Sequence, residues 1–236
     1  MNFSSNNYLI GIKYDNPNFI YFSIPKTGCT SVKWSIANFF DINVDPKKGI
    51  HSTKLNSIEV LSKRDLPTHF KFAFVRNPWD RVVSLYNDKI CKYYDKICKK
   101  YNYDNNFITK KKIIRQDFDD PYFGLKYTDV FYAGMSFKEF VKKICSISDD
   151  DANKHFKSQY TFIYDKNGDI AVDFLGRFEN FEKDFNYISS KISNDFVMFH
   201  KNISKHEHYR AYYDEVTQKM VEERYEKDLR LFNYKF

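Results

Sequence analysis

Cysteine, glycine and proline are scarce in this sequence. Its 236 residues include 4 cysteines, 7 glycines and 6 prolines. No two cysteines stand in a CxxC pair, so neither a zinc ribbon nor a thioredoxin-type motif is expected. Four cysteines spread over this length do not make a disulfide scaffold, and they favour a reducing compartment. The shortage of glycine and proline excludes collagen-like chains and flexible linkers.

Long apolar runs are also missing. No window approaches the roughly 18–20 consecutive apolar residues that a membrane-spanning helix needs. The first ten residues contain neither the basic n-region nor the apolar stretch of a secretory signal. We therefore expect a cytoplasmic protein without a transmembrane segment.

The composition is that of a basic globular protein. Hydrophobic residues make up 42% and charged residues 29%, and the net charge is +7. This excess of lysine and arginine suits a polyanionic partner, although a solvated lysine-rich exterior gives the same balance. The lysine-rich runs do not alternate with aromatics as nucleic-acid platforms do, so no nucleic-acid partner is expected. The length predicts one domain over residues 1–236.

A strand, a polar loop and a helix follow one another near the N-terminus. Phe19–Ile24 is an apolar, β-rich run, and residues 31–40 have helical spacing of apolar residues. A loop before a helix gathers backbone N–H groups in positive potential, which binds anions. A GxxxxGK[ST] order is absent, so this is not a Walker A loop, and an ordinary polar turn is the alternative. The candidate anion-binding residues are Pro25, Lys26, Thr27, Gly28, Cys29, Thr30 and Ser31.

A second strand and helix repeat this arrangement. Residues 70–75 predict a buried strand, after which Asn77 suits a helix N-cap and Pro78 the first helical position. Arg76, at the carboxyl end of the strand, offers a fork to a phosphate, and Ser84 a neutral donor. A structural ion pair and a packing serine are the alternatives. Two such units predict an α/β fold with a central, mainly parallel sheet and flanking helices.

Further elements are predicted from local signals. Ser136 and Glu139 form a capping box that opens a helix. Asn167-Gly168 predicts a hairpin between residues 161–164 and 170–174. Apolar spacing predicts helices over residues 181–192 and 214–231. The polar and aromatic residues 100–132 are interpreted as an insertion that shapes an acceptor site.

The segments PKTGCTS (25–31) and RNPWDRVVSLY (76–86) together resemble the 5′-phosphosulfate loop and the 3′-phosphate motif of sulfotransferases. The similarity is to the carbohydrate branch of that family, and DFLGRFEN (173–180) with the C-terminal stretch from His200 extends it. The resemblance implies a P-loop-like sulfotransferase fold and the donor 3′-phosphoadenosine 5′-phosphosulfate (PAPS), with adenosine 3′,5′-bisphosphate (PAP) as product. It further implies a carbohydrate hydroxyl as acceptor and no metal.

The resemblance also implies roles for individual residues. Lys26 stabilises the departing 5′-phosphate oxygen. Lys201, Asn202 and Ser204 resemble the family's late donor-binding loop. His51 lies between the two phosphate motifs, where this family commonly places its catalytic base, and an imidazole with an ordinary pKa near 6.5 can take a proton at neutral pH. A surface histidine is the alternative.

Two other functional classes remain open. A P-loop-type kinase of a small molecule needs a Walker lysine and a Mg²⁺ carboxylate, neither of which is evident in the sequence. A non-catalytic polyanion-binding module would use the net charge of +7. The histidines at 200, 206 and 208 lack the spacing of zinc ligands, so no metal site is expected there.

Overall fold

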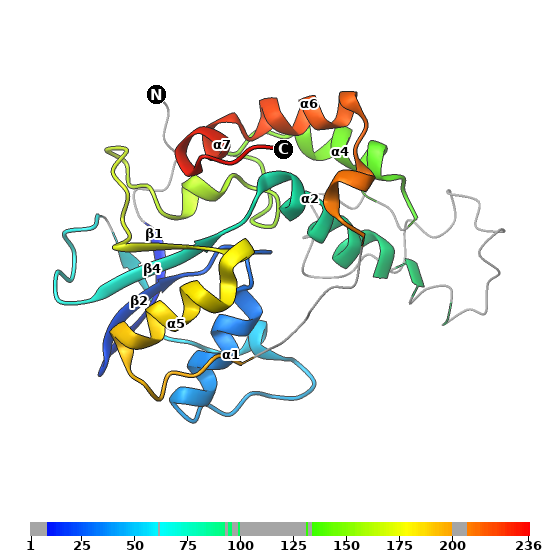
Figure 1. Cartoon of the computed structure of the whole chain (residues 1–236). Coiled ribbons are helices and arrows are strands. Elements are labelled where there is room, and N and C mark those ends of the chain that lie inside the picture. Colours follow the sequence, from blue (N-terminus) through cyan, green and yellow to red (C-terminus); the bar gives the residue numbers. More distant parts are fainter. Residues whose placement is uncertain are drawn as a thin grey trace. The chain divides into compact units, whose positions relative to one another are not determined.

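The computed structural model describes residues 9–60, 62–92, 94–95, 99, 131, 134–199 and 207–236. The chain divides into two compact units (Figure 1). The first unit comprises Met1–Asn77 and Ser158–Lys205, and the second comprises Pro78–Lys157 and His206–Phe236. The single domain over residues 1–236 stays a prediction.

The first unit contains a five-stranded sheet. In sequence order its strands are β1 (Leu9–Asp15), β2 (Asn18–Phe22), β3 (Ser57–Val60), β4 (Phe70–Val75) and β5 (Phe174–Arg177). Across the sheet the strands follow the order β3-β1-β2-β4-β5. With helices flanking the sheet, this is the expected α/β class.

The prediction of a mainly parallel sheet holds for one half of it. The strands β2, β4 and β5 are parallel neighbours, whereas β1 pairs antiparallel with both β2 and β3. The antiparallel half was missed because its strands carry weak signals. β1 contains Gly11, a poor strand former, and β3 has only four residues, two of them apolar.

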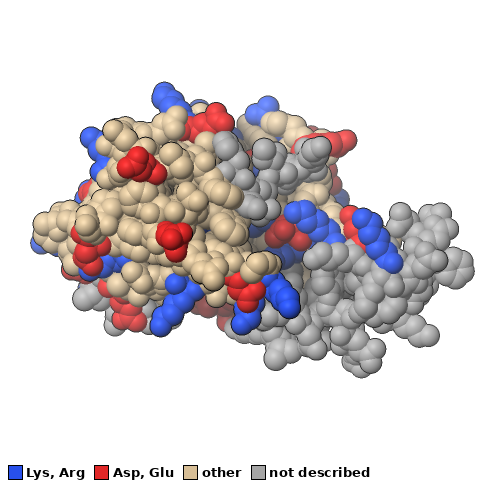
Figure 2. All heavy atoms as spheres, turned by 90° about the horizontal axis from the view of Figure 1, so that it is seen from below, with Lys and Arg blue, Asp and Glu red and all other residues tan. Residues whose placement is uncertain are grey.

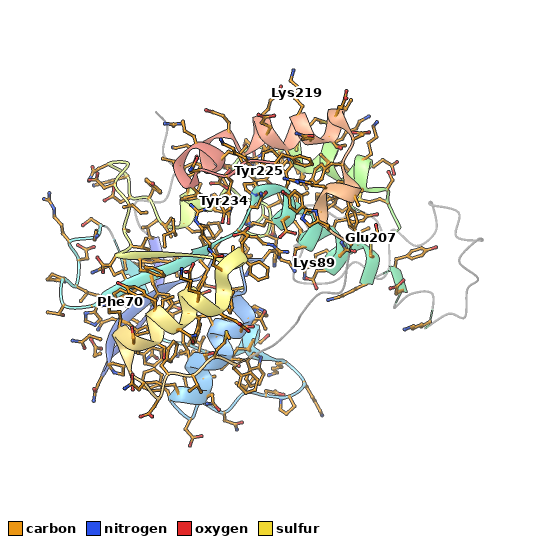
Figure 3. All side chains as sticks on the ribbon, in the orientation of Figure 1. Phe70, Lys89, Glu207, Lys219, Tyr225 and Tyr234 are labelled. Carbon is orange, nitrogen blue, oxygen red and sulfur yellow. The ribbon has the colours of Figure 1, made fainter. Side chains whose placement is uncertain are left out.

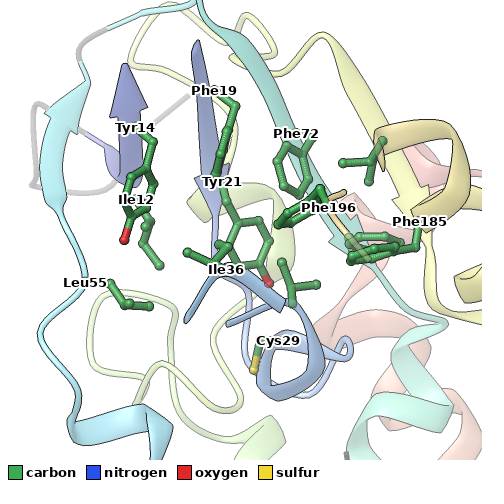
Figure 4. Close-up of a cluster of buried hydrophobic side chains, with 13 residues drawn as sticks. Ile12, Tyr14, Phe19, Tyr21, Cys29, Ile36, Leu55, Phe72, Phe185 and Phe196 are labelled. Carbon is green, nitrogen blue, oxygen red and sulfur yellow. The ribbon is translucent and has the colours of Figure 1, made fainter. Parts of the chain in front are cut away.

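Two helices cover one face of this sheet, α1 (Cys29–Phe39) and α5 (Phe181–Ile192) (Figure 1). Alternate strand residues point towards them, because side chains of a strand alternate between its two faces. Figure 4 shows this core, in which Tyr21 and Phe72 stack with ring centroids 5.1 Å apart. Val32 and Ile36 of α1 are fully buried in it. The aromatic richness of the sequence therefore fills the space between sheet and helices.

The predicted hairpin around Asn167-Gly168 is confirmed at its turn, but its arms do not form two paired strands. Residues 159–162 form a 3-10 turn, η4 (Gln159–Phe162), and a single antiparallel bridge joins Tyr164 to Ile170. The Asp165 carboxylate accepts from the N–H groups of Asn167 and Asp169, so the side chain closes the turn. The chain then enters β5, which pairs with β4 instead of a hairpin partner.

The second unit is helical. Its elements are α2 (Pro78–Tyr86), a π-helical turn η2 (Asn87–Cys91), α4 (Phe137–Cys145), α6 (Glu215–Arg224) and α7 (Glu226–Phe232). A short 3-10 segment, η6 (Tyr209–Tyr212), precedes α6. The predicted capping box of α4 is confirmed, since Ser136 accepts from the Glu139 N–H and Glu139 accepts from the Ser136 N–H.

The single helix predicted over residues 214–231 is two helices. Tyr225, labelled in Figure 3, separates α6 from α7 with φ −112° and ψ 21°. Its ring is buried and its hydroxyl donates to the Phe156 carbonyl at 2.7 Å. This tertiary bond fixes Tyr225 in the core at the point where the helix breaks, which apolar spacing cannot show.

Candidate functional site

Three loops of the first unit begin at neighbouring strand ends. Because β2, β4 and β5 run parallel and adjacent, their carboxyl ends lie at one edge of the sheet. β2 leads to the loop of residues 23–28, β4 to Arg76 and Asn77, and β5 to the 3-10 turn η5 (Phe178–Asn180). Open α/β sheets bind ligands at this edge. Both predicted phosphate motifs therefore start at the place where the fold favours a ligand.

The loop before α1 has a backbone that requires glycine at one position. Gly28 lies at φ 85° and ψ 10°, the left-handed region, and directly precedes α1. A Cβ at this position would come within 2.5 Å of the Phe181 ring. The first turn of α1 carries no acidic side chain, so the positive potential of this helix end is not neutralised there. The local structure suits an anion.

Thr27 and Lys26 play different parts in this loop. Thr27 is fully buried, and its hydroxyl donates to the Ile24 carbonyl at 2.9 Å. This hydrogen bond joins two residues of the loop and therefore stabilises its conformation. Lys26 is half-buried and adopts a left-handed φ of 71°, which is uncommon outside glycine. Its carbonyl oxygen accepts a hydrogen bond from Arg76.

Arg76 joins the two phosphate motifs within the first unit. Its Nη1 donates to the Lys26 carbonyl at 3.2 Å, and its guanidinium carbon lies 4.1 Å from the centre of the Phe178 ring. Arg76 is 4% exposed. The side chain is therefore held against an aromatic face at the base of the predicted anion loop.

His51 also reaches this loop. It lies in the 3-10 turn η1 (Ile50–Ser52) and is exposed. Its Nε2 is 2.9 Å from Oγ1 of Thr30, which stands in the first turn of α1. The fold thus brings the histidine singled out in the sequence beside the loop, 21 residues away along the chain.

The remaining predicted site residues lie elsewhere. Ser84 is buried on α2 of the second unit. Lys201, Asn202 and Ser204 lie outside the described residues, as do His200, His206 and most of the predicted insertion at 100–132. Phe199, next to this segment in the sequence, donates its N–H to Ser35 Oγ of α1 at 2.8 Å. Phe199 also stacks on Trp34, with centroids 5.5 Å apart.

Two neighbours of Arg76 were missed as site residues. Gln159 is fully buried and bonds both backbone groups of Arg76, and Glu179 accepts from the Asn77 N–H at 2.6 Å. Glu179 lies within residues 173–180, the segment whose resemblance to the family was noted in the sequence. Gln159 sits in a polar and aromatic stretch with no motif, so the sequence contained no signal for it.

The described part of the chain shows neither a metal-ligand cluster nor a membrane-spanning helix. Nowhere in it do three or more His, Cys, Asp or Glu side chains gather as metal ligands would. Among its helices, none combines the length and apolar character needed to cross a membrane.

Comparison with known proteins identifies the class. A family model described as "Sulfotransferase family" matches residues 12–235. The chain therefore belongs to the sulfotransferase family, as its two phosphate motifs implied, and the match runs through both units. No solved structure matches this chain.

The curated relatives are all named carbohydrate sulfotransferases. Carbohydrate sulfotransferase 11 of Rattus norvegicus is 26% identical over 186 residues, which cover 72% of this chain and 49% of the relative. The Mus musculus protein of the same name gives the same values. Carbohydrate sulfotransferase 14 of Danio rerio is 27% identical over 190 residues, covering 75% and 47%. The chain spans about half the length of the curated relatives it matches.

Proposed function

We propose that this chain transfers a sulfuryl group from PAPS to a hydroxyl group of a carbohydrate. Membership of the sulfotransferase family supports the reaction class, and the names of the relatives support the acceptor class. One observation carries the proposal. The loop suited to a phosphosulfate and the candidate base meet at Thr30, where His51 Nε2 lies 2.9 Å from the hydroxyl oxygen.

The loop before α1 suits the 5′-phosphosulfate of the donor. Gly28 takes a left-handed conformation at the start of α1, with the Phe181 ring packed where a Cβ would lie, and the helix N-terminus favours negative charge. Pro25, Thr27, Cys29 and Ser31 complete the loop and fix its course. Lys26 supplies a positive charge for the oxygen that leaves sulfur, where charge builds up in the transition state.

The other proposed contacts with PAPS are made by residues later in the chain than β4. Arg76 binds the 3′-phosphate through its guanidinium group, whose plane lies over the Phe178 ring. The resemblance assigns Ser84 to the same phosphate, and Lys201, Asn202 and Ser204 to a late loop over the nucleotide. These contacts fix the donor's position relative to the acceptor.

The transfer needs one proton acceptor and no metal. The acceptor oxygen forms a bond to sulfur, and the bond from sulfur to the 5′-phosphate oxygen breaks with its electron pair left on PAP. His51 takes the proton of the acceptor hydroxyl, because an imidazole is a competent base near neutral pH. Nε2 of His51 lies 2.9 Å from the Thr30 hydroxyl oxygen, and the tautomer that leaves Nε2 without a hydrogen is the one that can act as the base.

Substitution of His51 tests the role of the base. His51→Ala and His51→Asn should each lower kcat by ~10²–10⁴-fold, the usual contribution of a positioned base. The affinity for PAP should stay near wild type, because His51 faces the acceptor and not the nucleotide. Steady-state kinetics and calorimetry with PAP measure the two quantities. A kcat within about threefold of wild type would refute the role.

Matched ligands test the donor class. PAP should raise the melting temperature more than ATP with Mg²⁺ or heparin does, and activity should survive EDTA. On the face shown in Figure 2, basic and acidic side chains of the described residues are interspersed, which does not favour a polyanion-binding module on that face. Stabilisation by ATP only with Mg²⁺ would favour a kinase, and stabilisation by heparin alone would favour the binding module.

A further inference from the structure

Gln159 holds the end of β4 by both of its amide atoms. Its Oε1 accepts from the Arg76 N–H at 2.9 Å, and its Nε2 donates to the Arg76 carbonyl at 2.8 Å. The side chain is fully buried. A side-chain amide that bonds both groups of one residue fixes that residue's backbone in the manner of a neighbouring strand. Arg76 lies one residue beyond β4, where the sheet's own bonds have ended.

The next peptide is held as well. Glu179 accepts from the N–H of Asn77 at 2.6 Å, and its neighbour Phe178 lies under the Arg76 guanidinium. In the peptide that joins Arg76 to Asn77, Gln159 therefore binds the carbonyl group and Glu179 binds the N–H group on the opposite side. The direction in which the Arg76 side chain leaves the backbone is set by these contacts.

Arg76 in turn holds the backbone of the anion loop. Its Nη1 donates to the carbonyl of Lys26, a residue with a left-handed φ of 71°. That conformation is costly for a residue with a side chain, and it persists where the surroundings hold it. A shift of Arg76 would loosen the Lys26 carbonyl together with the guanidinium.

We infer that Gln159 is a positioning residue for donor binding: its two bonds to the backbone of Arg76 aim the guanidinium at the 3′-phosphate and hold the Lys26 loop. The inference rests on the proposed function, because it takes PAP as the ligand of Arg76. Gln159 is fully buried and acts through the backbone of Arg76. Its effect is therefore expected in the recognition of the 3′-phosphate and not in the proton transfer by His51.

The decisive variant is Gln159→Met, which keeps the length of the side chain and removes both bonds. Stability alone is not diagnostic, because the loss of any buried hydrogen-bonding partner destabilises a protein. The diagnostic quantity is the preference for PAP over 5′-AMP, which lacks the 3′-phosphate. Calorimetry with both ligands on wild type and variant gives this ratio of dissociation constants.

Gln159→Met should lower the preference for PAP by roughly tenfold, the scale of losing well-aligned hydrogen bonds at the phosphate. The KM for PAPS should rise by a similar factor, with kcat at saturating PAPS within about threefold of wild type. Gln159→Glu still accepts from the Arg76 N–H but, when ionised, cannot donate to the Arg76 carbonyl, and its buried negative charge opposes a phosphate, so it should also lower the preference for PAP. It also serves as the test variant if Gln159→Met does not fold.

Thr161→Val is the matched control. Thr161 stands in the same 3-10 turn, and its hydroxyl donates to the Ser158 carbonyl at 2.7 Å without reaching Arg76. This variant should lose stability and keep the wild-type preference for PAP. A folded Gln159 variant with an unchanged preference would overturn the inference. A wild-type protein without any preference for PAP would instead overturn the proposed function on which it rests.

Discussion

Two buried arginines of the same motif, Arg76 and Arg81, face different surroundings. Arg76 is 4% exposed and ends a strand of the first unit, and Arg81 is 2% exposed on α2 of the second unit. Arg76 Nη1 bonds a carbonyl of the anion loop. Arg81 donates to the carbonyls of Lys157 at 2.9 Å and Lys154 at 3.4 Å. Arg76 thus stabilises a loop at a strand end, whereas Arg81 connects α2 to the segment that contains Lys154 and Lys157.

The charges around Arg81 are those of a protein core. Burial lowers the pKa of Arg81, and the nearby Tyr225 and Asp228 oppose this shift. Asp228 is itself fully buried. Burial likewise raises the pKa of Tyr225, whose hydroxyl is bound to the Phe156 carbonyl. Burial of an arginine therefore does not by itself mark a binding site, and its position at a parallel strand end is the distinguishing feature.

The largest expected effect in this comparison is on stability in the second unit. Arg81→Ala removes the donor to two carbonyls and leaves Asp228 buried with less compensating charge. Breaking a buried ionic cluster in this way costs about 3–5 kcal/mol. Urea unfolding measures it. Arg230→Ala is the control, because this side chain is 64% exposed and its removal should change stability little. A similar loss of stability in both variants would show that the burial of Arg81 does not account for its effect.

Substitutions in the candidate site of the first unit should change the affinity for PAP. Lys26→Ala and Arg76→Ala should each weaken PAP binding by ~1.5–3 kcal/mol, or roughly 10- to 150-fold, because each removes a charged donor. Calorimetry on folded variants gives the values. Arg64→Ala, an exposed arginine in the segment before β4, is the control. If both the Lys26 and the Arg76 variant bind PAP with unchanged affinity, the assignment of the donor site is wrong.

The elements that the sequence predicted well have strong local signals. The strand predicted over 70–75 is β4, and the helix predicted over 181–192 is α5 with the same bounds. A continuous apolar run ended by Asn-Pro defines the first. Regular apolar spacing through Phe185 and Ile188 defines the second, and both side chains are fully buried. In such segments local preference and tertiary packing agree.

The elements that it missed depend on distant partners. β5 pairs with β4 because Gly176 lets the Phe74 ring approach, where a Cβ would come within 2.6 Å. Gln159 meets Arg76 across 83 residues of chain. Neither contact has a local pattern. The motif residues could be found by resemblance, whereas the residues that position them become visible in the folded chain.

A moderate effect is expected from Gly28→Ala. The left-handed φ of 85° costs a residue with a Cβ about 1–2 kcal/mol, and the added methyl group would meet the Phe181 ring. The variant should be less stable and bind PAP more weakly. Adding Phe181→Leu to it should recover part of the stability by making room. A variant with wild-type stability and PAP affinity would show that the loop does not need glycine.

The smallest effect concerns Asp214, the N-cap of α6 in the second unit. Its carboxylate accepts from the Thr217 N–H and lies 2.8 Å from Nζ of Lys138. The hydrogen bond from Lys138, followed by those from Thr217, lowers the pKa of Asp214 well below its ordinary value of 3.8. A lowered folded-state pKa stabilises the protein above the unfolded value and loses that effect as the pH falls through the folded value.

Asp214→Asn should therefore reduce the melting temperature slightly at pH 7, because asparagine caps a helix about as well but forms no ion pair. The gap between wild type and variant should narrow as the pH falls below about 4, since the Asp214 carboxylate of the unfolded chain then becomes protonated while the folded one, with its lowered pKa, stays ionised to lower pH. Thermal scans from pH 3 to pH 7 follow this gap. Calorimetry at pH 7 should give the same affinity for PAP in both proteins, because the change removes a stabilising contact of the second unit and leaves the Arg76 site intact. A gap that is independent of pH would contradict the ionic role of Asp214, and weaker PAP binding would contradict the separation drawn between the two arginines.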